Sequence, residues 1–218
     1  MLSFAEENYL KTIYHLSLKE GKGISNNSIS EILNTKPSSV TDMLKKLSNK
    51  KMIHHVKYYG VNMTEKGRKE ALNIVRKHRL WEVFLVEKLK FNWDEVHEIA
   101  EQLEHINSQL LIEKLDEFLG FPSVDPHGDP IPNQLGEIII KKQISLSQAL
   151  HDVTLTIVGL KETSPNFLKY LDKMGVYIGC KITILEKIEF DGSMEIRLEN
   201  KKTITISEVV SNNILITE

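Results

Sequence analysis

The chain has 218 residues, of which 41% are hydrophobic and 27% charged, and its formal net charge is −2. This composition is typical of a folded globular protein and excludes a collagenous or low-complexity chain. A single cysteine, Cys180, excludes a disulfide framework and a four-cysteine zinc site. No stretch approaches the ~20 apolar residues that cross a bilayer, so we expect a cytoplasmic protein with no membrane partner.

Charge is distributed unevenly along the chain. Residues 1–76 hold 13 Lys and Arg against 7 Asp and Glu, a net charge of +6, whereas residues 77–218 hold 15 against 23, a net charge of −8. A basic first third suggests contact with a polyanion, and an acidic remainder suggests that it binds cations. Chance clustering produces the same asymmetry, so charge alone leaves both interpretations open.

Three helices and two short strands are predicted in the first 64 residues. Helical spacing of apolar residues and a glycine turn between β-branched segments are the signals for them. Ser28 and Glu31 have the spacing of a capping box, and Pro37 stands at the start of a helix, where proline is tolerated. The predicted helices cover residues 5–18, 28–33 and 37–47, and the strands cover 52–56 and 61–64.

This order of elements is that of a winged helix-turn-helix. On the third helix Val40, Leu44 and Leu47 point inward, which leaves hydroxyls and lysines on the outer face. Hydroxyls and lysines bind phosphates, and small side chains let a helix enter the major groove. The same residue types also occur on any solvated helix face. The DNA-binding residues predicted from this face and from the wing are Lys36, Ser38, Ser39, Thr41, Lys45, Lys46, Lys57 and Tyr59.

Three further helices are predicted over residues 65–89, 92–107 and 108–119. Their many apolar side chains indicate a helical dimer interface, because such interfaces resemble a protein core. Residues 120–136 contain four Pro and three Gly, so we expect irregular structure and a domain boundary there. From Thr154 onward the pattern alternates with period two, and five short β-branched segments predict a small β-barrel.

Histidines and carboxylates recur at helical spacing in the middle of the chain. The residues concerned are His97, Glu101, Glu104 and His105, preceded by the pair His78 and Glu82. These spacings place each set on one face of a helix, and Asp125 and His127 add another possible pair. Imidazole and carboxylate together suit divalent ions such as Mn²⁺ and Fe²⁺. The alternative is an ordinary polar stripe on a solvated face.

Several segments match the sequence pattern of a known family. They are EENYLKTIYHL, PSSVTDMLKKL, MTEKGRKEAL, RKHRLWEVFL, VHEIAEQLEHI and DPHGDPIP, followed by the β-rich tail. The chain thus resembles, over essentially its whole length, the diphtheria-toxin-repressor-like family of metal-dependent transcriptional repressors. The resemblance implies a multidomain, mainly α protein. Its parts would be a winged helix-turn-helix at residues 1–72, a helical metal-binding and dimerisation domain at 73–140, and an SH3-like (FeoA-like) domain at 141–218.

The resemblance also implies two sets of metal ligands. The primary effector site would consist of Asn8, Glu101, Glu104 and His105. The ancillary site would consist of His78, Glu82 and His97, joined by Asp125, His127 and a carboxylate of the SH3-like domain, for which we choose Glu162. Asn8 stands where members have Asp or Met, and Lys11 stands where a manganese member has Glu. A ligand set of oxygen and nitrogen alone favours Mn²⁺ and leaves Fe²⁺ open.

The predicted function is that of a homodimeric repressor, not an enzyme. It would bind double-stranded operator DNA when Mn²⁺ or Fe²⁺ is bound, and so control metal-ion homeostasis genes. One alternative is a metal-dependent hydrolase, but the sequence offers no separate general base, phosphate loop or nucleophile elbow. The other is a winged-helix protein that senses an organic ligand.

Overall fold

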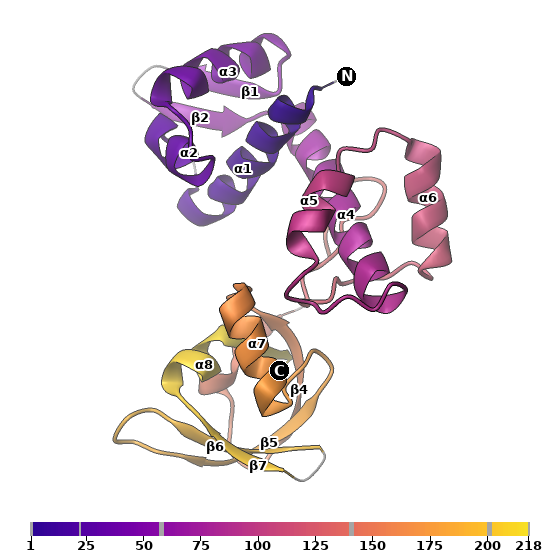
Figure 1. Ribbon diagram of the computed structural model, residues 1–218. Helices are drawn as coiled ribbons and strands as arrows, with labels where there is room; N and C mark the ends of the chain where they lie inside the picture. Colours follow the sequence, from indigo (N-terminus) through magenta and orange to yellow (C-terminus); the bar gives the residue numbers. More distant parts are fainter. Residues whose placement is uncertain (1, 22, 57–58, 140–141, 200–201, 218) are drawn as a thin grey trace. The chain divides into compact units, whose positions relative to one another are not determined.

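The computed structural model describes residues 2–21, 23–56, 59–139, 142–199 and 202–217 (Figure 1). Contacts along the backbone divide the chain into two compact units. Unit 1 consists of Met1–His78, Glu101–Ile112 and Pro132–Ile138, and unit 2 of Arg79–Ala100, Glu113–Ile131 and Ile139–Glu218. The division into three domains expected above stays a prediction.

Unit 1 begins with the three helices and the hairpin of a winged helix-turn-helix. They are α1 (Phe4–Glu20), α2 (Asn26–Ile32), α3 (Pro37–Asn49), β1 (Ile53–Val56) and β2 (Gly60–Met63). The two strands pair antiparallel. This order confirms the prediction for the first 64 residues.

Local capping explains where the first two helices begin. Ser3 and Glu6 form a capping box at the start of α1, in which each side chain bonds to the other residue's backbone N–H. The cap of α2 is Ser25, whose Oγ accepts a hydrogen bond from the N–H of Ser28 at 3.0 Å. The predicted capping box at Ser28 was therefore wrong, because a second serine three residues earlier satisfies the same helix end.

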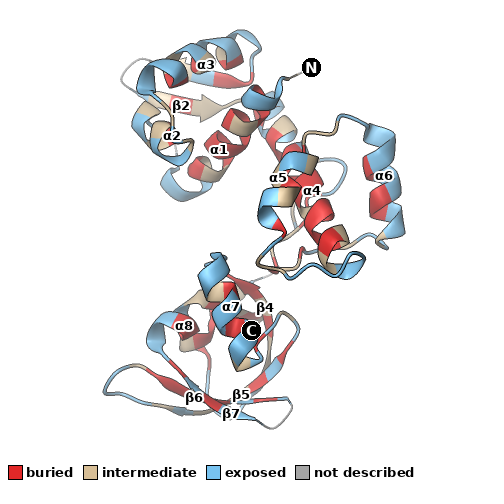
Figure 2. Cartoon of the chain, viewed as in Figure 1, coloured by how far each residue is buried: buried red, intermediate tan, exposed pale blue. Residues whose placement is uncertain are grey.

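The core of unit 1 fixes which face of α3 is exposed. Leu10 and Ile13 of α1, Leu44 and Leu47 of α3 and Leu72 of the following helix belong to one buried cluster. Figure 2 shows the result, with buried residues on one side of α3 and exposed residues on the other. The inward positions predicted for this helix are confirmed.

The middle of the chain forms α4 (Glu65–Glu87), α5 (His97–Leu103) and α6 (Gln109–Phe118). The helix predicted over 92–107 is thus shorter at both ends. At its start the N–H of Glu95 closes a turn onto the carbonyl of Asn92 at 3.0 Å. At its end Glu104 and His105 lie in the turn that follows Leu103. The prediction that these two residues share a helix face with His97 was therefore wrong.

Residues 120–136 have no helix or strand, as predicted, and contain one isolated bridge between Val124 and Pro130. Among the helices in the described ranges, none is long and apolar enough to cross a membrane.

Unit 2 contains a six-stranded antiparallel sheet in the order β3-β8-β4-β5-β6-β7. Its strands are β3 (Gln143–Ser145), β4 (Thr154–Leu160), β5 (Lys181–Lys187), β6 (Met194–Leu198), β7 (Thr203–Ile206) and β8 (Ile214–Thr217). The short helices η1 (Leu146–Gln148), α7 (Pro165–Met174) and α8 (Glu208–Asn213) complete it. Buried Ile157, Ile184 and Ile196 from the sheet pack with Leu168 and Leu171 of α7.

The structure differs from the predicted barrel in two ways. It has β3 as a sixth strand, whose three residues are too few to give a periodic pattern. The strands it describes also leave the sheet open between β3 and β7.

Candidate metal centres and DNA-binding face

The first candidate centre lies in unit 1. Asn8 and Lys11 come from the buried side of α1, Glu101 from the last turn of α5, and Glu104 and His105 from the turn that follows. Residues about 90 positions apart in the sequence are thus brought together. All four ligands predicted for the primary site belong to this unit.

The ammonium group of Lys11 is held by three carboxylate oxygens. Its Nζ lies 2.5 Å from Oε1 of Glu101 and 2.7 and 2.8 Å from Oε1 and Oε2 of Glu104. The Glu104 side chain is fully buried, whereas that of Glu101 is 35% exposed. The centre therefore contains a positive charge from the chain itself, at the position where a manganese member has Glu.

Three buried atoms of the predicted ligands are without a hydrogen-bond partner among the described residues, and one of them, Oε1 of Glu104, is held by the ion pair with Lys11. They are Oδ1 of Asn8, Oε1 of Glu104 and Nε2 of His105. The last two atoms are 3.7 Å apart. This is too long for a hydrogen bond, but two ligands on one ion with bonds of ~2.1 Å lie about 3–4 Å apart. Because such oxygen and nitrogen donors suit Mn²⁺ and Fe²⁺, this set fits a divalent cation.

Neighbouring groups orient the His105 ring and keep the Glu104 carboxyl ionised. Nδ1 of His105 donates a hydrogen bond to Oε2 of Glu7 at 2.6 Å, which leaves the lone pair of Nε2 for a ligand. Burial opposes ionisation of Glu104. The hydrogen bond that it accepts from His78 and the charge of Lys11 outweigh burial and hold the pKa of this carboxyl below its usual value. Glu104 is therefore an anion at neutral pH.

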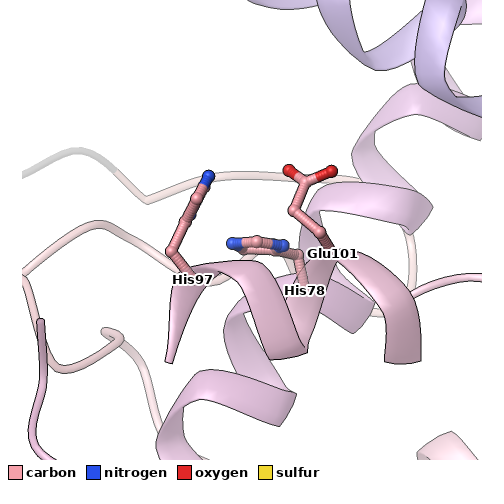
Figure 3. Close-up of side chains that lie close together, drawn as sticks. All are labelled: His78, His97 and Glu101. Carbon is pink, nitrogen blue, oxygen red and sulfur yellow. The ribbon is translucent and has the colours of Figure 1, made fainter. Parts of the chain in front are cut away.

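His78 lies with the first centre and not with Glu82. Its Nδ1 donates to Oε2 of Glu104 at 2.7 Å. Figure 3 shows His78 beside His97 and Glu101, which lie one turn apart on α5, and one ligand atom from each comes within 4.8 Å of the others. The His97 side chain is 67% exposed, and its Nδ1 lies 3.6 Å from Oε1 of Glu82.

A second candidate centre lies in unit 2 and consists of Glu82, Asp125 and His127. All three are buried, and one ligand atom from each lies within 4.8 Å of the others. Nε2 of His127 donates a hydrogen bond to the carbonyl of Trp93 at 2.9 Å. Its Nδ1 lies 3.8 Å from Oε2 of Glu82. Of the predicted ancillary set, Glu82, Asp125 and His127 form one group, and His78 and His97 lie in another with Glu101.

The second centre is rich in negative charge. Burial and the charges of Glu82 and Asp129 raise the pKa of Asp125 well above its usual value, against the opposing effect of Arg79. Nε of Arg79 lies 3.5 Å from Oδ2 of Asp125. A cation that binds Asp125 would displace the proton of its carboxyl group or the Arg79 guanidinium beside it.

Glu162, the carboxylate chosen from the C-terminal part, is exposed and accepts a hydrogen bond from the N–H of Ser164 at 2.7 Å. It does not belong to the Glu82 group among the residues searched for such clusters. Its role as a ligand stays a prediction.

The outer face of α3 has the exposure that DNA binding requires. Lys36, Ser38, Ser39, Lys45 and Lys46 are exposed. Thr41 is half-buried, because its Oγ1 accepts from Nδ2 of Asn26 at 3.1 Å and donates to the carbonyl of Pro37 at 3.0 Å. Tyr59 of the hairpin is 78% exposed, whereas Lys57 lies outside the described residues.

Comparison with known proteins agrees with this architecture. Models of the N-terminal DNA-binding domain of iron-dependent repressors, of their metal-binding and dimerisation domain, and of the FeoA domain match residues 1–61, 64–133 and 144–218. A manganese-dependent transcriptional repressor solved in complex with manganese is 30% identical, with a TM-score of 0.82 over 98% of this chain and 99% of that one. The chain belongs to the diphtheria-toxin-repressor-like family.

Two curated members of this family are similar to part of this chain. The regulator MntR of Oceanobacillus iheyensis is 34% identical over 53% of this chain and 77% of its own length. The iron-dependent repressor IdeR of Mycobacterium tuberculosis is 34% identical over 58% of this chain and 54% of its own length. Members of the family are DNA-binding transcriptional regulators, and the fold class predicted from the sequence, with its SH3-like C-terminal domain, is confirmed.

Sequence reasoning missed three residues that this family member uses around its centres. Glu7 orients His105, Lys11 occupies the first centre, and Arg79 pairs with Asp125 in the second. Glu7 and Lys11 lie within three residues of Asn8, so the proximity of charged residues to a predicted ligand was the available signal. No comparable signal existed for Arg79, because its partner is 46 positions away.

Proposed function

We propose that this protein is a homodimeric repressor that binds double-stranded operator DNA in the cytoplasm when Mn²⁺ or Fe²⁺ is bound, and that it is not an enzyme. The observation that best supports this is that two buried ligand atoms, Oδ1 of Asn8 and Nε2 of His105, have no hydrogen-bond partner among the described residues, while Oε1 of Glu104 is held by the ion pair with Lys11. One of these atoms belongs to the helix that supports the DNA-binding face, and the other two follow α5. A shared cation would therefore act on the DNA-binding helices directly.

The residues of the first centre explain how such control could work. When bound, a divalent cation supplies a fixed positive charge that several donors share. Asn8 fixes the position of α1 through its Oδ1, while Glu104 and His105 fix the turn after α5. Because α3 packs against α1 through the shared core of unit 1, the position of α1 sets the orientation of the recognition helix. In a dimer, two such helices must be held about 34–36 Å apart to read successive major grooves.

The DNA contact is proposed to come from the outer face of α3 and the hairpin. Exposed lysines would bind phosphates, and the two serines at the start of α3 are small enough to let the helix approach the bases closely. The outer face of α3 has no arginine. Recognition of guanine by a bidentate arginine from this face is therefore excluded, and the shape of the DNA should contribute more to specificity.

The proposed dimer uses apolar residues that the single chain leaves exposed. On α6, Leu110 is 67% and Phe118 64% exposed. They are eight positions apart, which places their side chains about 80° from each other around the helix. The match to a metal-binding and dimerisation domain over residues 64–133 supports a second copy as the partner. Replacing Phe118 with Glu should convert the dimer to a monomer in analytical ultracentrifugation.

Metal-dependent DNA binding is the decisive test. Duplexes selected from a randomised pool should be bound at least about fivefold more tightly with Mn²⁺, or with Fe²⁺ under anaerobic conditions, than with a chelator. His105→Ala should remove this difference and leave the dimer intact. Ser147→Ala, a half-buried position in unit 2 outside both centres, is the control and should keep it. Equal affinity with and without metal, or metal-dependent cleavage of the duplex, would contradict the proposal.

A further inference from the structure

The first centre already contains a cation that belongs to the chain. Nζ of Lys11 contacts both oxygens of Glu104 and one oxygen of Glu101, at 2.5 to 2.8 Å. The lysine side chain is only 11% exposed. An ammonium in this position satisfies two carboxylates that would otherwise repel each other at short range.

These oxygens are the same ones that a metal ion needs. Oε1 of Glu104, 3.7 Å from Nε2 of His105, also lies 2.7 Å from the Lys11 ammonium. Oε2 of Glu104 accepts hydrogen bonds from both Lys11 and His78. A divalent cation bound to Oε1 of Glu104 would lie close to the Lys11 ammonium on the same oxygen, and in a buried site their like charges repel strongly. Binding of one therefore requires withdrawal of the other from Glu104.

Glu101 offers the lysine a position to which it can withdraw. Its carboxylate lies at the rim of the centre, where it is 35% exposed, whereas Glu104 is fully buried. The four-carbon stem of lysine is flexible enough to keep the contact with Glu101 while leaving Glu104.

We propose that Lys11 is an internal substitute for a divalent cation, which ties α1 to Glu101 and Glu104 in the metal-free protein and must be displaced from Glu104 when the effector metal binds. This inference rests on the proposed metal-dependent function. Two consequences follow. Lys11 lowers the affinity of the first centre for its metal, and it keeps α1 in place when no metal is present.

Lys11→Met tests the inference, because methionine keeps most of the side-chain volume and removes the charge. Lys50→Met is the matched control. Lys50 also binds a carboxylate of α1, with Nζ 2.7 Å from Oε2 of Glu6, but it lies outside the centre. The full-length wild type and both variants are stripped of metal with a chelator. Thermal unfolding is then followed by circular dichroism with and without saturating Mn²⁺, and Mn²⁺ binding is measured by calorimetry.

We expect Lys11→Met to unfold at a lower temperature than the wild type without metal and to recover with Mn²⁺. Its dissociation constant for Mn²⁺ should be lower than that of the wild type by a factor of at least about ten. Lys50→Met should lose the same stability with and without Mn²⁺ and keep the wild-type dissociation constant. Wild-type values of both quantities in Lys11→Met would overturn the inference.

The remaining outcomes also decide the question. If Lys11→Met is unfolded without metal and folded with Mn²⁺, the substitution of one cation for the other is supported. If it is unfolded in both conditions, Lys11 has a role that no divalent ion can take over, and the inference fails. A wild type that binds no Mn²⁺, while Lys11→Met binds it, would support the inference and contradict the proposed function. Absence of binding in both proteins would refute the two together.

Discussion

The turn that holds the second centre should be sensitive to a single added methyl group. Gly128 lies between His127 and Asp129 with φ +88°, and a Cβ there would lie 2.2 Å from the carbonyl oxygen of Val158 and 2.4 Å from Cα of Gly159. Both contacts are with the backbone of β4, which cannot rotate away as a side chain can. Gly128→Ala therefore forces the turn and the strand apart.

The loss of folding stability in Gly128→Ala has two parts, backbone strain and overpacking, and a matched control separates them. Gly179 has a similar backbone conformation, with φ +92°, but nothing lies within 4 Å of an added Cβ. Gly179→Ala should thus cost only the left-handed backbone strain, about 1–2 kcal/mol. Gly128→Ala adds an overpacking cost of about 1–3 kcal/mol, for a total of about 2–5 kcal/mol. Urea unfolding followed by circular dichroism measures both. Equal losses in the two variants would refute the close packing of this turn against β4.

Three further outcomes are expected. Glu7→Gln should weaken Mn²⁺ binding about 10- to 100-fold in calorimetry, because the carboxylate that orients His105 is lost, and an unchanged affinity would exclude this role. Lys45→Ala should lower the slope of log affinity for duplex DNA against log salt by about one, and an unchanged slope would remove Lys45 from the interface. Burial raises the pKa of the Cys180 thiol, so this thiol should resist alkylation at pH 8 in the native protein and react fully in urea. Rapid alkylation of the native protein would contradict the burial of Cys180 in the core of unit 2.

Local patterns predicted the winged helix-turn-helix because each of its elements is determined by nearby residues. The caps at Ser3 and Ser25 and the inward spacing of Val40, Leu44 and Leu47 act within a few positions. The position of the α2 cap was misassigned because Ser25 and Ser28 are both suitable caps, and only the folded chain decides between them. Spacing of ligand-type residues predicted a metal cluster in the right segment for the same local reason.

Long-range contacts account for what the sequence could not predict. Helical periodicity favoured one helix from 92 to 107, but the Trp93 carbonyl bonds to His127, 34 positions later, and α5 begins only at His97. The contact between Lys11 and Glu101 spans 90 positions, so the sequence shows that Lys11 is near Asn8 but not that it binds Glu101. Likewise, His78 and Glu82 share a helix face yet belong to different centres, because what decides their partners is the fold of the segments around them.

Buried carboxylates need a positive charge or a proton before any metal arrives, and the two centres meet this need differently. In the first centre Lys11 neutralises Glu101 and Glu104, and the pKa of Glu104 stays low. In the second, Arg79 lies beside Asp125, whose raised pKa favours the protonated form. Metal binding is then an exchange, in which an ammonium group leaves one carboxylate or a proton leaves the other. The affinity for a metal ion depends on the free-energy difference between the metal-bound centre and the centre that holds an ammonium group or a proton instead. The residue that holds this charge before the metal binds therefore affects the affinity, as the ligands do. For this reason ligand-type residues in a sequence indicate where a cation binds but not how tightly.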